Sequence, residues 1–183
     1  MRAAVYRRYG PPEVVRIEDT PKPVPKDDEI LVRVRATTIC AADWRFRRAN
    51  PILIRLMNGL VAPKKVNVLG MELSGTIESV GKNATRFAPG DQVFGSTLFK
   101  MGAHAQYARV PDHGMVAEKP SNLPLEDSAA ILFGGLTALH FLRGKVQAGN
   151  NVLVYGASGS VGTSAVQLAK HFGARVTGGM QHG

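Results

Sequence analysis

The stretch NVLVYGASGSVG, from Asn151 to Gly162, decides the fold class of this chain. Its first five residues form a short apolar run rich in β-branched side chains, which predicts a strand over Asn151–Tyr155. From Val161 to Phe172 apolar residues recur at helical spacing, and Gly173 is the residue type that commonly ends a helix. A second short strand is predicted over 174–177. Strand, glycine-rich turn, helix and strand together predict a βαβ unit.

The glycines between the first strand and the helix match a phosphate-binding turn. Read against G-x-G-x-x-G, the matching residues are Ala157, Gly159 and Gly162, and Gly156 is an additional glycine. Gly159 would let the backbone approach a pyrophosphate, Gly162 would let the helix pack closely on the sheet, and the first helical N–H groups attract negative charge. An ordinary flexible turn is the alternative. The predicted cofactor-binding residues of this turn are Gly156, Ala157, Ser158, Gly159, Ser160, Val161 and Gly162.

Length, hydropathy and cysteine content narrow the class of protein. A chain of 183 residues can form one large domain or two small ones. The sequence contains no run of about 18 apolar residues and no signal-peptide core, so we expect a soluble, cytoplasmic protein. Cys40 is the only cysteine, which excludes an intramolecular disulfide and a multi-cysteine metal site.

The chain is basic, with a formal net charge of +9. This charge would favour anions, either as a solvated basic face or by attracting a phosphorylated cofactor. No recognised nucleic-acid-binding motif accompanies it, so we expect no nucleic-acid partner. The basic residues that stand close together are Arg45, Arg47, Arg48, Arg55, Lys64 and Lys65.

The first 120 residues read as short strands separated by turns rich in proline, glycine and aspartate. Glu29–Ala36 and Leu73–Val80 alternate between apolar and other residues, and Ala103–Val110 is a third candidate strand. In the first of these strands the alternation places Leu31 on the face opposite Ile30. Many short strands at close spacing predict a small closed or half-open β barrel.

Helical segments interrupt and follow this β region. Ile39–Ala49 and Ile52–Leu60 are predicted as short helices beside the barrel. Leu125–Leu132 and Leu136–Leu142 are predicted as helices interrupted by Gly134–Gly135. We place a domain boundary near Lys119–Pro120, which gives a domain over 1–120 and a second over 121–183.

Four motifs in order resemble one known family. They are VLGMELSGTIESVG (Val68–Gly81), FAPGDQVFG (Phe87–Gly95), AAILFGGLTALHFL (Ala129–Leu142) and VLVYGASGSVGTSAVQLAK (Val152–Lys170). The sequence resembles the medium-chain dehydrogenase/reductases, within them the zinc-free quinone oxidoreductase, or zeta-crystallin-like, branch. The resemblance implies a mixed α and β fold: a GroES-like, partly open β barrel followed by the start of a Rossmann doubly wound domain.

The same resemblance implies an activity and cofactor contacts. Relatives transfer a hydride from NADPH, or NADH, to a quinone, enone or related carbonyl. In them the loop matching Gly156–Gly162 holds the pyrophosphate, and the residue matching Thr137 reaches the nicotinamide carboxamide. The segment Cys40–Asp43 lines the cleft, which adds Cys40 to the expected cofactor-binding residues.

The resemblance also predicts that no metal is bound. Zinc-dependent relatives hold a catalytic metal with a cysteine at the position of Cys40, a histidine after the glycine matching Gly70, and a third ligand. Here Met71 occupies the position of that histidine. A thioether is a poor zinc ligand, and catalytic zinc sites usually need three protein ligands. A zinc alcohol dehydrogenase is therefore the disfavoured alternative, and Cys40 is expected to be a small packed residue.

Without zinc, another group must stabilise the charge on the substrate oxygen and supply a proton. The polar candidates are Asp43, Tyr107, Thr137 and His140, and we name Asp43 and Thr137 as the catalytic candidates. Glu72 is expected to be tied into the hydrogen bonding of the barrel, and His104 and His140 are expected to be structural. Water or the ribose hydroxyl of the cofactor is an equally good proton source.

Only two of about six Rossmann strands are present, which predicts an exposed sheet edge and an uncovered apolar face. We assign that face to Val152, Val154, Val161 and Val176. Such a chain is expected to be a fragment, a truncated product or an oligomer formed through the exposed edge. A non-catalytic binding or interaction module is the alternative function. The expected partner is a small-molecule carbonyl or quinone, without a membrane partner.

Overall fold

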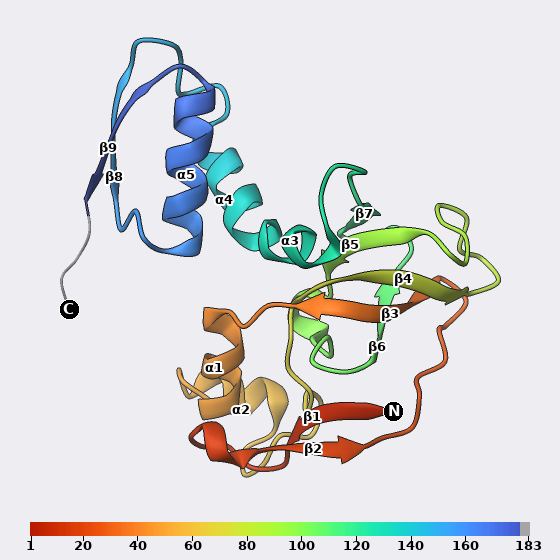
Figure 1. Cartoon of the computed structure of the whole chain (residues 1–183). Helices are drawn as coiled ribbons and strands as arrows, with labels where there is room; N and C mark the ends of the chain where they lie inside the picture. Colours follow the sequence, from red (N-terminus) through yellow and green to blue (C-terminus); the bar gives the residue numbers. More distant parts are fainter. Residues whose placement is uncertain (180–183) are drawn as a thin grey trace. The chain divides into compact units, whose positions relative to one another are not determined.

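The computed structural model describes residues 1–179, which form two compact units. The first unit is Met1–Ala129, coloured from red to green in Figure 1, and the second begins at Ala130. Leu125 and Glu126 belong with the first unit, because the Ser74 hydroxyl donates to the Leu125 carbonyl and Arg35 pairs with Glu126. The domain boundary near Lys119–Pro120 stays a prediction.

The first unit is mainly antiparallel β structure. A five-stranded sheet has the order β6-β3-β4-β5-β7, and β1 and β2 form a separate pair. Isolated bridges from Ala3 to Ala105 and from Val5 to Val68 join this pair to the rest. This arrangement confirms the partly open barrel. Its elements are β1 (Arg2–Tyr6), η1 (Pro12–Val14), β2 (Val15–Asp19), β3 (Glu29–Thr37), α1 (Ala41–Arg48), α2 (Leu53–Asn58), β4 (Glu72–Val80), β5 (Gln92–Ser96), η2 (Leu98–Lys100), β6 (Tyr107–Pro111), β7 (Val116–Glu118) and α3 (Leu125–Ala130).

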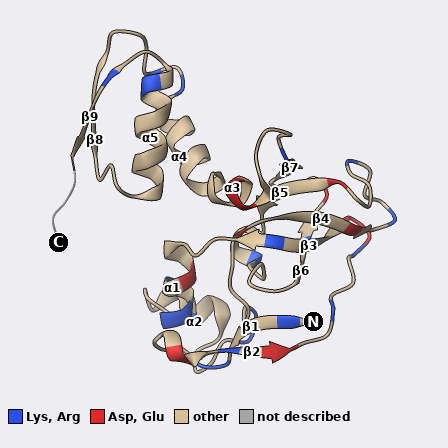
Figure 2. Cartoon of the chain, viewed as in Figure 1, with Lys and Arg blue, Asp and Glu red and all other residues tan. Residues whose placement is uncertain are grey.

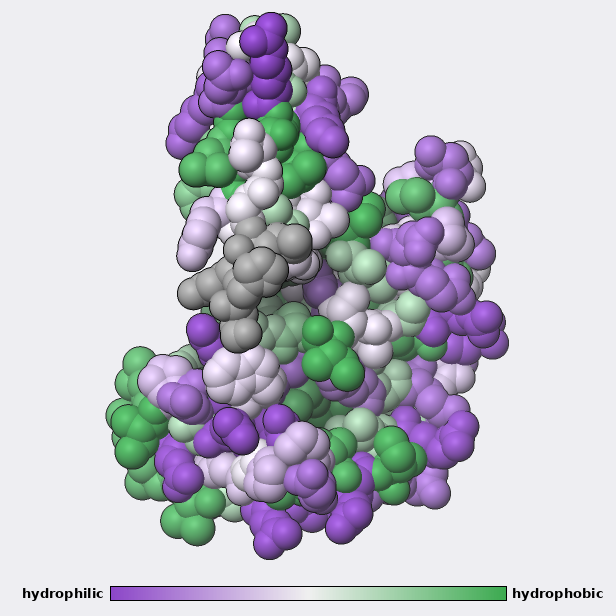
Figure 3. Space-filling model, turned by 60° about the vertical axis from the view of Figure 1, so that its left-hand side comes forward, coloured by the Kyte–Doolittle hydropathy of each residue, from purple (hydrophilic) through white to green (hydrophobic). Residues whose placement is uncertain are grey.

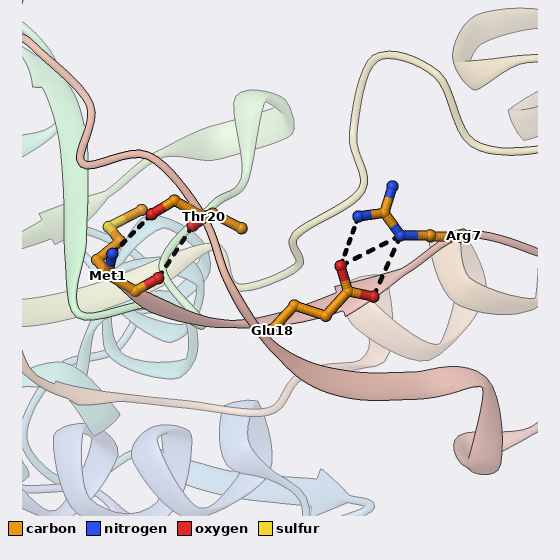
Figure 4. Close-up of polar contacts among 4 residues, drawn as sticks. All are labelled: Met1, Arg7, Glu18 and Thr20. Atoms are coloured by element: carbon orange, nitrogen blue, oxygen red, sulfur yellow. Dashed lines mark hydrogen bonds and ion pairs between the residues drawn. The ribbon is translucent and has the colours of Figure 1, made fainter.

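Two sets of polar contacts link β1 and β2 and the residues beside them (Figure 4). The amino terminus of Met1 donates to the Thr20 carbonyl at 2.6 Å, and the Thr20 hydroxyl donates back to the Met1 carbonyl at 3.2 Å. The Arg7 Nε, just beyond the end of β1, donates to the Glu18 Oε1 at 3.1 Å. The register pairs Glu18 with Ala3, so the long Arg7 side chain reaches along the pair to make this contact.

The core of the sheet is formed by β-branched and leucine side chains of β3, β4, β5 and β6. Ile30, Val32, Leu73 and Val93 are all fully buried. Leu31 is also buried, which corrects the simple alternation predicted for this strand. Leu31 is not part of the cluster that holds Ile30 and Val32, so burial in this part of β3 is not confined to the face predicted to be apolar.

The third predicted strand begins later than the sequence suggests, because β6 starts at Tyr107 and not at Ala103. The residues before Tyr107 bond to other segments. The Ala103 N–H donates to the Gly70 carbonyl, and the His104 N–H donates to the Leu69 carbonyl at 2.8 Å. These contacts hold residues 103–105 against the segment before β4.

The second unit contains the predicted βαβ arrangement. β8 and β9 are parallel, with Val152 opposite Val176, and α5 connects them. The strand predicted over 174–177 is thus confirmed with shifted ends. Residues 180–183, the end of the predicted second domain, lie outside the described residues. The elements of this unit are α4 (Leu132–Leu142), β8 (Asn151–Tyr155), α5 (Ser160–His171) and β9 (Arg175–Gly179).

The glycine pair in α4 does not interrupt the helix. α4 runs continuously through Gly134 and Gly135, and the break between α3 and α4 falls at Ile131 instead. A Cβ on Gly134 would lie 2.4 Å from the Ser160 Oγ of α5. Gly134 therefore serves the close approach of two helices, which overrides its low helix propensity.

The exposed face of the β8–β9 pair is the opposite of the predicted one. Val154 is buried and Val152, Val161 and Val176 are half-buried, because α5 packs against this pair. The residues that face away are Leu153 and Tyr155, which are 70% and 73% exposed. Figure 3 is turned so that the left-hand side of Figure 1, where β8 and β9 lie, comes forward, and it shows apolar residues in green on this part of the surface.

Candidate functional site

The turn between β8 and α5 is shaped by its glycines. Gly156 has a φ of +80°, a conformation that residues with a side chain rarely adopt. A Cβ on Gly162 would lie 2.1 Å from the Gly156 carbonyl oxygen, so only glycine permits this approach. The N–H groups of Gly156 and Ala157 donate to the Gly179 carbonyl, which fixes the turn to the end of β9.

The N-terminus of α5 is open. Gly159 is the N-cap residue, and no side chain forms a capping hydrogen bond there. Two nearby hydroxyl groups are used elsewhere: the Thr163 hydroxyl donates to the Ala157 carbonyl, and that of Ser164 to the Ser160 carbonyl. Ser158, Gly159 and Ser160 are exposed. The first N–H groups of a helix lack intrahelical acceptors, so this end can bind an anion.

Thr137 lies in the same unit as this turn. It is half-buried on α4, three residues after Gly134, the residue that contacts Ser160 at the start of α5. Thr137 thus lies on the helix that packs against α5, and α5 begins at the predicted phosphate site. Gly156–Gly162 and Thr137 are the predicted residues that lie in the second unit.

Cys40 and Asp43 belong to the first unit, where they begin α1. They form a capping box, in which the Asp43 Oδ2 accepts the Cys40 N–H at 2.7 Å. The other carboxylate oxygen, Oδ1, accepts the Gly70 N–H at 2.8 Å. Asp43 is buried, and both of its oxygens are engaged by backbone groups. This arrangement favours a structural task for Asp43.

The Cys40 thiol is half-buried and not in a disulfide. Burial raises its pKa, and the nearby Asp43 carboxylate raises it further. A raised pKa keeps the sulfur in the neutral thiol form at neutral pH. This is the behaviour of a packed cysteine and not of a thiolate ligand or nucleophile.

Glu72 is buried in the hydrogen-bond network predicted for it. Its carboxylate accepts the Thr38 hydroxyl, and the Thr37 hydroxyl donates to its carbonyl at 2.7 Å. The His104 Nε2 lies 2.9 Å from the Thr38 carbonyl oxygen, which gives this histidine a structural contact as well. Sequence reasoning named Glu72 and His104, but the link through Thr38 has no signal in sequence spacing.

Met71 lies where the zinc-dependent relatives carry a histidine. Its side chain is buried and belongs to an apolar cluster with Phe46, Leu69 and Met101. A thioether packed in this cluster is a hydrophobic core group. Among residues 1–179, no group of three histidine, cysteine, aspartate or glutamate side chains is placed to hold a metal ion.

The two remaining polar candidates lie at other positions. Tyr107 begins β6, and the Lys22 ammonium lies 4.1 Å from its ring centroid. His140 is exposed on α4 and packs its ring edge against Phe141. Neither residue belongs to a cluster of catalytic groups.

Comparison with known proteins supports the family assignment. The model of the alcohol dehydrogenase GroES-like domain matches residues 26–121. A human quinone oxidoreductase is 36% identical over 97% of this chain and 52% of its own length. The structure of a quinone oxidoreductase from Coxiella burnetii superposes with a TM-score of 0.85 at 29% identity, over 97% of this chain and 56% of that one.

A mycobacterial structure described as complexed with NADPH is 30% identical, with a TM-score of 0.81. It covers 97% of this chain, and this chain covers 52% of it. The chain thus spans about half the length of the relatives it matches. The matched family model covers more than half of the chain. The chain belongs to the family of the alcohol dehydrogenase GroES-like domain, in the quinone oxidoreductase branch of the medium-chain dehydrogenase/reductases.

Proposed function

We propose that this chain acts as a zinc-independent, NAD(P)H-dependent oxidoreductase of the quinone oxidoreductase type. It would transfer a hydride from NADPH, or NADH, to a quinone, enone or related carbonyl. The observation that carries the proposal is the uncapped N-terminus of α5 behind the Gly156 turn. A glycine-shaped turn followed by free helical N–H groups suits the pyrophosphate of a dinucleotide.

The residues present fit the cofactor. Gly156–Gly162 would hold the pyrophosphate, since a Cβ at Gly162 would collide with the backbone that forms the cradle. Thr137 would reach the nicotinamide carboxamide, and Cys40, whose raised pKa keeps it a neutral thiol, is the further residue proposed to bind the cofactor. When bound, NADPH supplies the hydride.

The chain must also stabilise negative charge on the substrate oxygen. Asp43 and Thr137 are the candidates for this chemistry. Both oxygens of Asp43 accept backbone N–H groups, which supports a positioning task at the start of α1. The Thr137 hydroxyl is the better donor to the oxygen, with the proton drawn from water or from the ribose hydroxyl of the cofactor.

A second candidate function is a non-catalytic interaction module. It is favoured by the exposed Leu153 and Tyr155 on the open face of the β8–β9 pair. A second copy of the chain could cover this face or extend the sheet at its edge. For either function we propose a small-molecule or protein partner without nucleic acid, and a cytoplasmic location.

Oxidation of NADPH in the presence of a simple quinone or an enone, with a metal chelator present, tests the enzyme proposal. We expect turnover with at least one acceptor that is unchanged by the chelator. Absence of turnover together with saturable NADPH binding would place the cofactor site but contradict catalysis by this chain. A stable dimer without cofactor binding would favour the interaction module.

A further inference from the structure

The segment between Asp43 and Glu72 carries positive charge without any compensating acid. It contains no aspartate or glutamate but has six basic residues, and among residues 1–179 none of the six forms an ion pair. Figure 2 shows Lys and Arg on and around α1 and α2. This basic set consists of Arg45, Arg47, Arg48, Arg55, Lys64 and Lys65.

The helix α2 in this segment is firmly held by one side. Ile54 and Asn58, four residues apart, are both buried. The Asn58 side-chain amide donates to the Tyr6 hydroxyl and to the Val66 carbonyl, each at 3.0 Å. Its oxygen accepts the N–H groups of Lys65 and Val66. The inward face of α2 is therefore fixed by polar contacts as well as by packing.

The outward face of α2 is aliphatic. Leu53, Leu56 and Met57 lie at the spacing that places side chains on one side of a helix, and all three are exposed. Leu60 and Val61 continue this surface, with Val61 87% exposed. The Arg55 guanidinium donates to the Leu60 carbonyl at 3.2 Å, which holds the loop to the helix. A contiguous exposed aliphatic surface of this kind marks an interaction site.

A hollow beside α2 joins apolar and basic groups. It has a volume of about 520 Å³ and is lined by Phe46, Met57 and Phe99 together with Lys65, Lys100 and Arg109. Lys100 and Arg109 also pair with the Glu29 carboxylate, whereas Lys65 forms no ion pair within residues 1–179. Phe99 is exposed. The apolar surface and the positive charge thus meet at one place, as they do in proteins that bind amphipathic anions.

We propose that α2 and residues 59–65 dock the protein on the surface of an anionic lipid bilayer. The aliphatic side chains Leu53, Leu56 and Leu60 would enter the boundary between headgroups and acyl chains. The basic set and the hollow would meet the phosphate groups. The segment has six basic residues and no acidic one beside its exposed aliphatic side chains, so it complements a surface that is both anionic and apolar, as an anionic bilayer is.

This docking is peripheral and independent of the proposed enzymatic function. The sequence predicts no membrane partner because it has no spanning run, but binding at a bilayer surface needs no such run. Within residues 1–179, no helix is both long and apolar enough to cross a membrane.

Co-sedimentation of the 183-residue chain with phosphatidylcholine vesicles, with and without phosphatidylserine, tests the proposal. We expect binding to the vesicles that contain phosphatidylserine, with affinity that falls as salt is raised. Leu56→Asp should weaken this binding by about tenfold or more, because it places a carboxylate in the apolar surface. The double variant Lys64→Glu with Lys65→Glu should also weaken it by about tenfold.

Val24→Asp is the matched control, because Val24 is exposed to a similar degree and lies outside the segment. It should bind the vesicles as the unmodified chain does. The proposal is overturned if the chain binds neither vesicle, or binds both equally at all salt concentrations. It is equally overturned if Leu56→Asp dissolves a dimer or a complex with an acidic protein but leaves vesicle binding unchanged.

Discussion

The starts of α1 and α5 present the same backbone problem and solve it in opposite ways. At α1 the Asp43 carboxylate accepts the Cys40 N–H and, with its second oxygen, the Gly70 N–H. At α5 no side chain caps the helix, and Gly159 occupies the N-cap position. One helix end is closed by a carboxylate of the chain itself, and the other is left open for an external anion.

This difference separates structure from function in the molecule. A closed helix end stabilises the fold, so changes there should alter the free energy of unfolding. An open end leaves N–H groups without protein acceptors, so changes there should alter cofactor binding. Substitutions at the two helix ends should therefore affect stability and cofactor binding separately.

Asp43→Ala should have the largest effect on stability. It leaves the Cys40 and Gly70 N–H groups without their acceptor, and we expect a loss of about 2–4 kcal/mol in the free energy of unfolding. Urea denaturation followed by circular dichroism measures this loss. Asp43→Asn keeps one acceptor oxygen, so its free energy of unfolding should fall by less than that of Asp43→Ala. A loss below about 0.5 kcal/mol for Asp43→Ala would show that the cap is not structural.

Gly162→Val should disrupt the open end. Its Cβ would lie 2.1 Å from the Gly156 carbonyl oxygen, so the turn must move. We expect a loss of about 1–3 kcal/mol in stability and the loss of NADPH binding. Gly135→Ala is the matched control, since a Cβ there meets nothing within 4 Å. It should raise stability by about 0.5–1 kcal/mol and leave NADPH binding unchanged.

Gly159→Asp would close the open end with a carboxylate at the N-cap position, where it can accept the N–H of the second or third helical residue. The backbone there is extended, and an added Cβ meets only the Gly156 carbonyl oxygen at 3.6 Å, so the change should fit. Stability should rise by a few tenths of a kcal/mol, to about 1 at most, while NADPH binding weakens by about tenfold or more. Gly159→Ala should show neither effect strongly. Unchanged NADPH affinity in Gly159→Asp would exclude this helix end as the phosphate site.

The smallest expected effect concerns Cys40. Because burial and Asp43 raise the thiol pKa, alkylation of Cys40 should accelerate at a higher pH than alkylation of a free thiol does. Asp43→Asn should lower that pKa. The thiol pKa is higher in the folded than in the unfolded chain. The contribution of Cys40 to the free energy of unfolding is therefore fully present below the pKa of the unfolded chain and is lost as the pH rises through the pKa of the folded chain. Alkylation at the pH typical of a free thiol would contradict this account.

Local patterns predicted the elements whose determinants are local. β8 has its predicted bounds, and Gly173 follows the end of α5 because strand and helix signals lie within a few residues. Long-range contacts decided what the sequence missed. The sequence predicts a helix break at Gly134, whereas in the structure Gly134 lies in a continuous helix and allows Ser160 of α5 to approach closely. The bond from Gly70 to Asp43 joins residues 27 positions apart, so the sequence could name Asp43 only as a polar candidate.

The open face of β8 and β9 shows the same limit. The sequence groups Val152 and Val154 on one face of the strand, and both are less exposed than Leu153 and Tyr155. The hydropathy pattern could not predict which face of the β8–β9 pair α5 would cover. That face is selected by the right-handed connection between two parallel strands. The predicted face was therefore the covered one.

Titration of the 183-residue chain with NADPH and, in parallel, with NADH tests the central claim most directly, with cofactor fluorescence as the signal. The account predicts saturable binding of NADPH by the unmodified chain, strongly weakened in Gly159→Asp, while both proteins give folded circular dichroism spectra. A folded chain that binds neither cofactor would contradict the claim that the open start of α5 is a dinucleotide site.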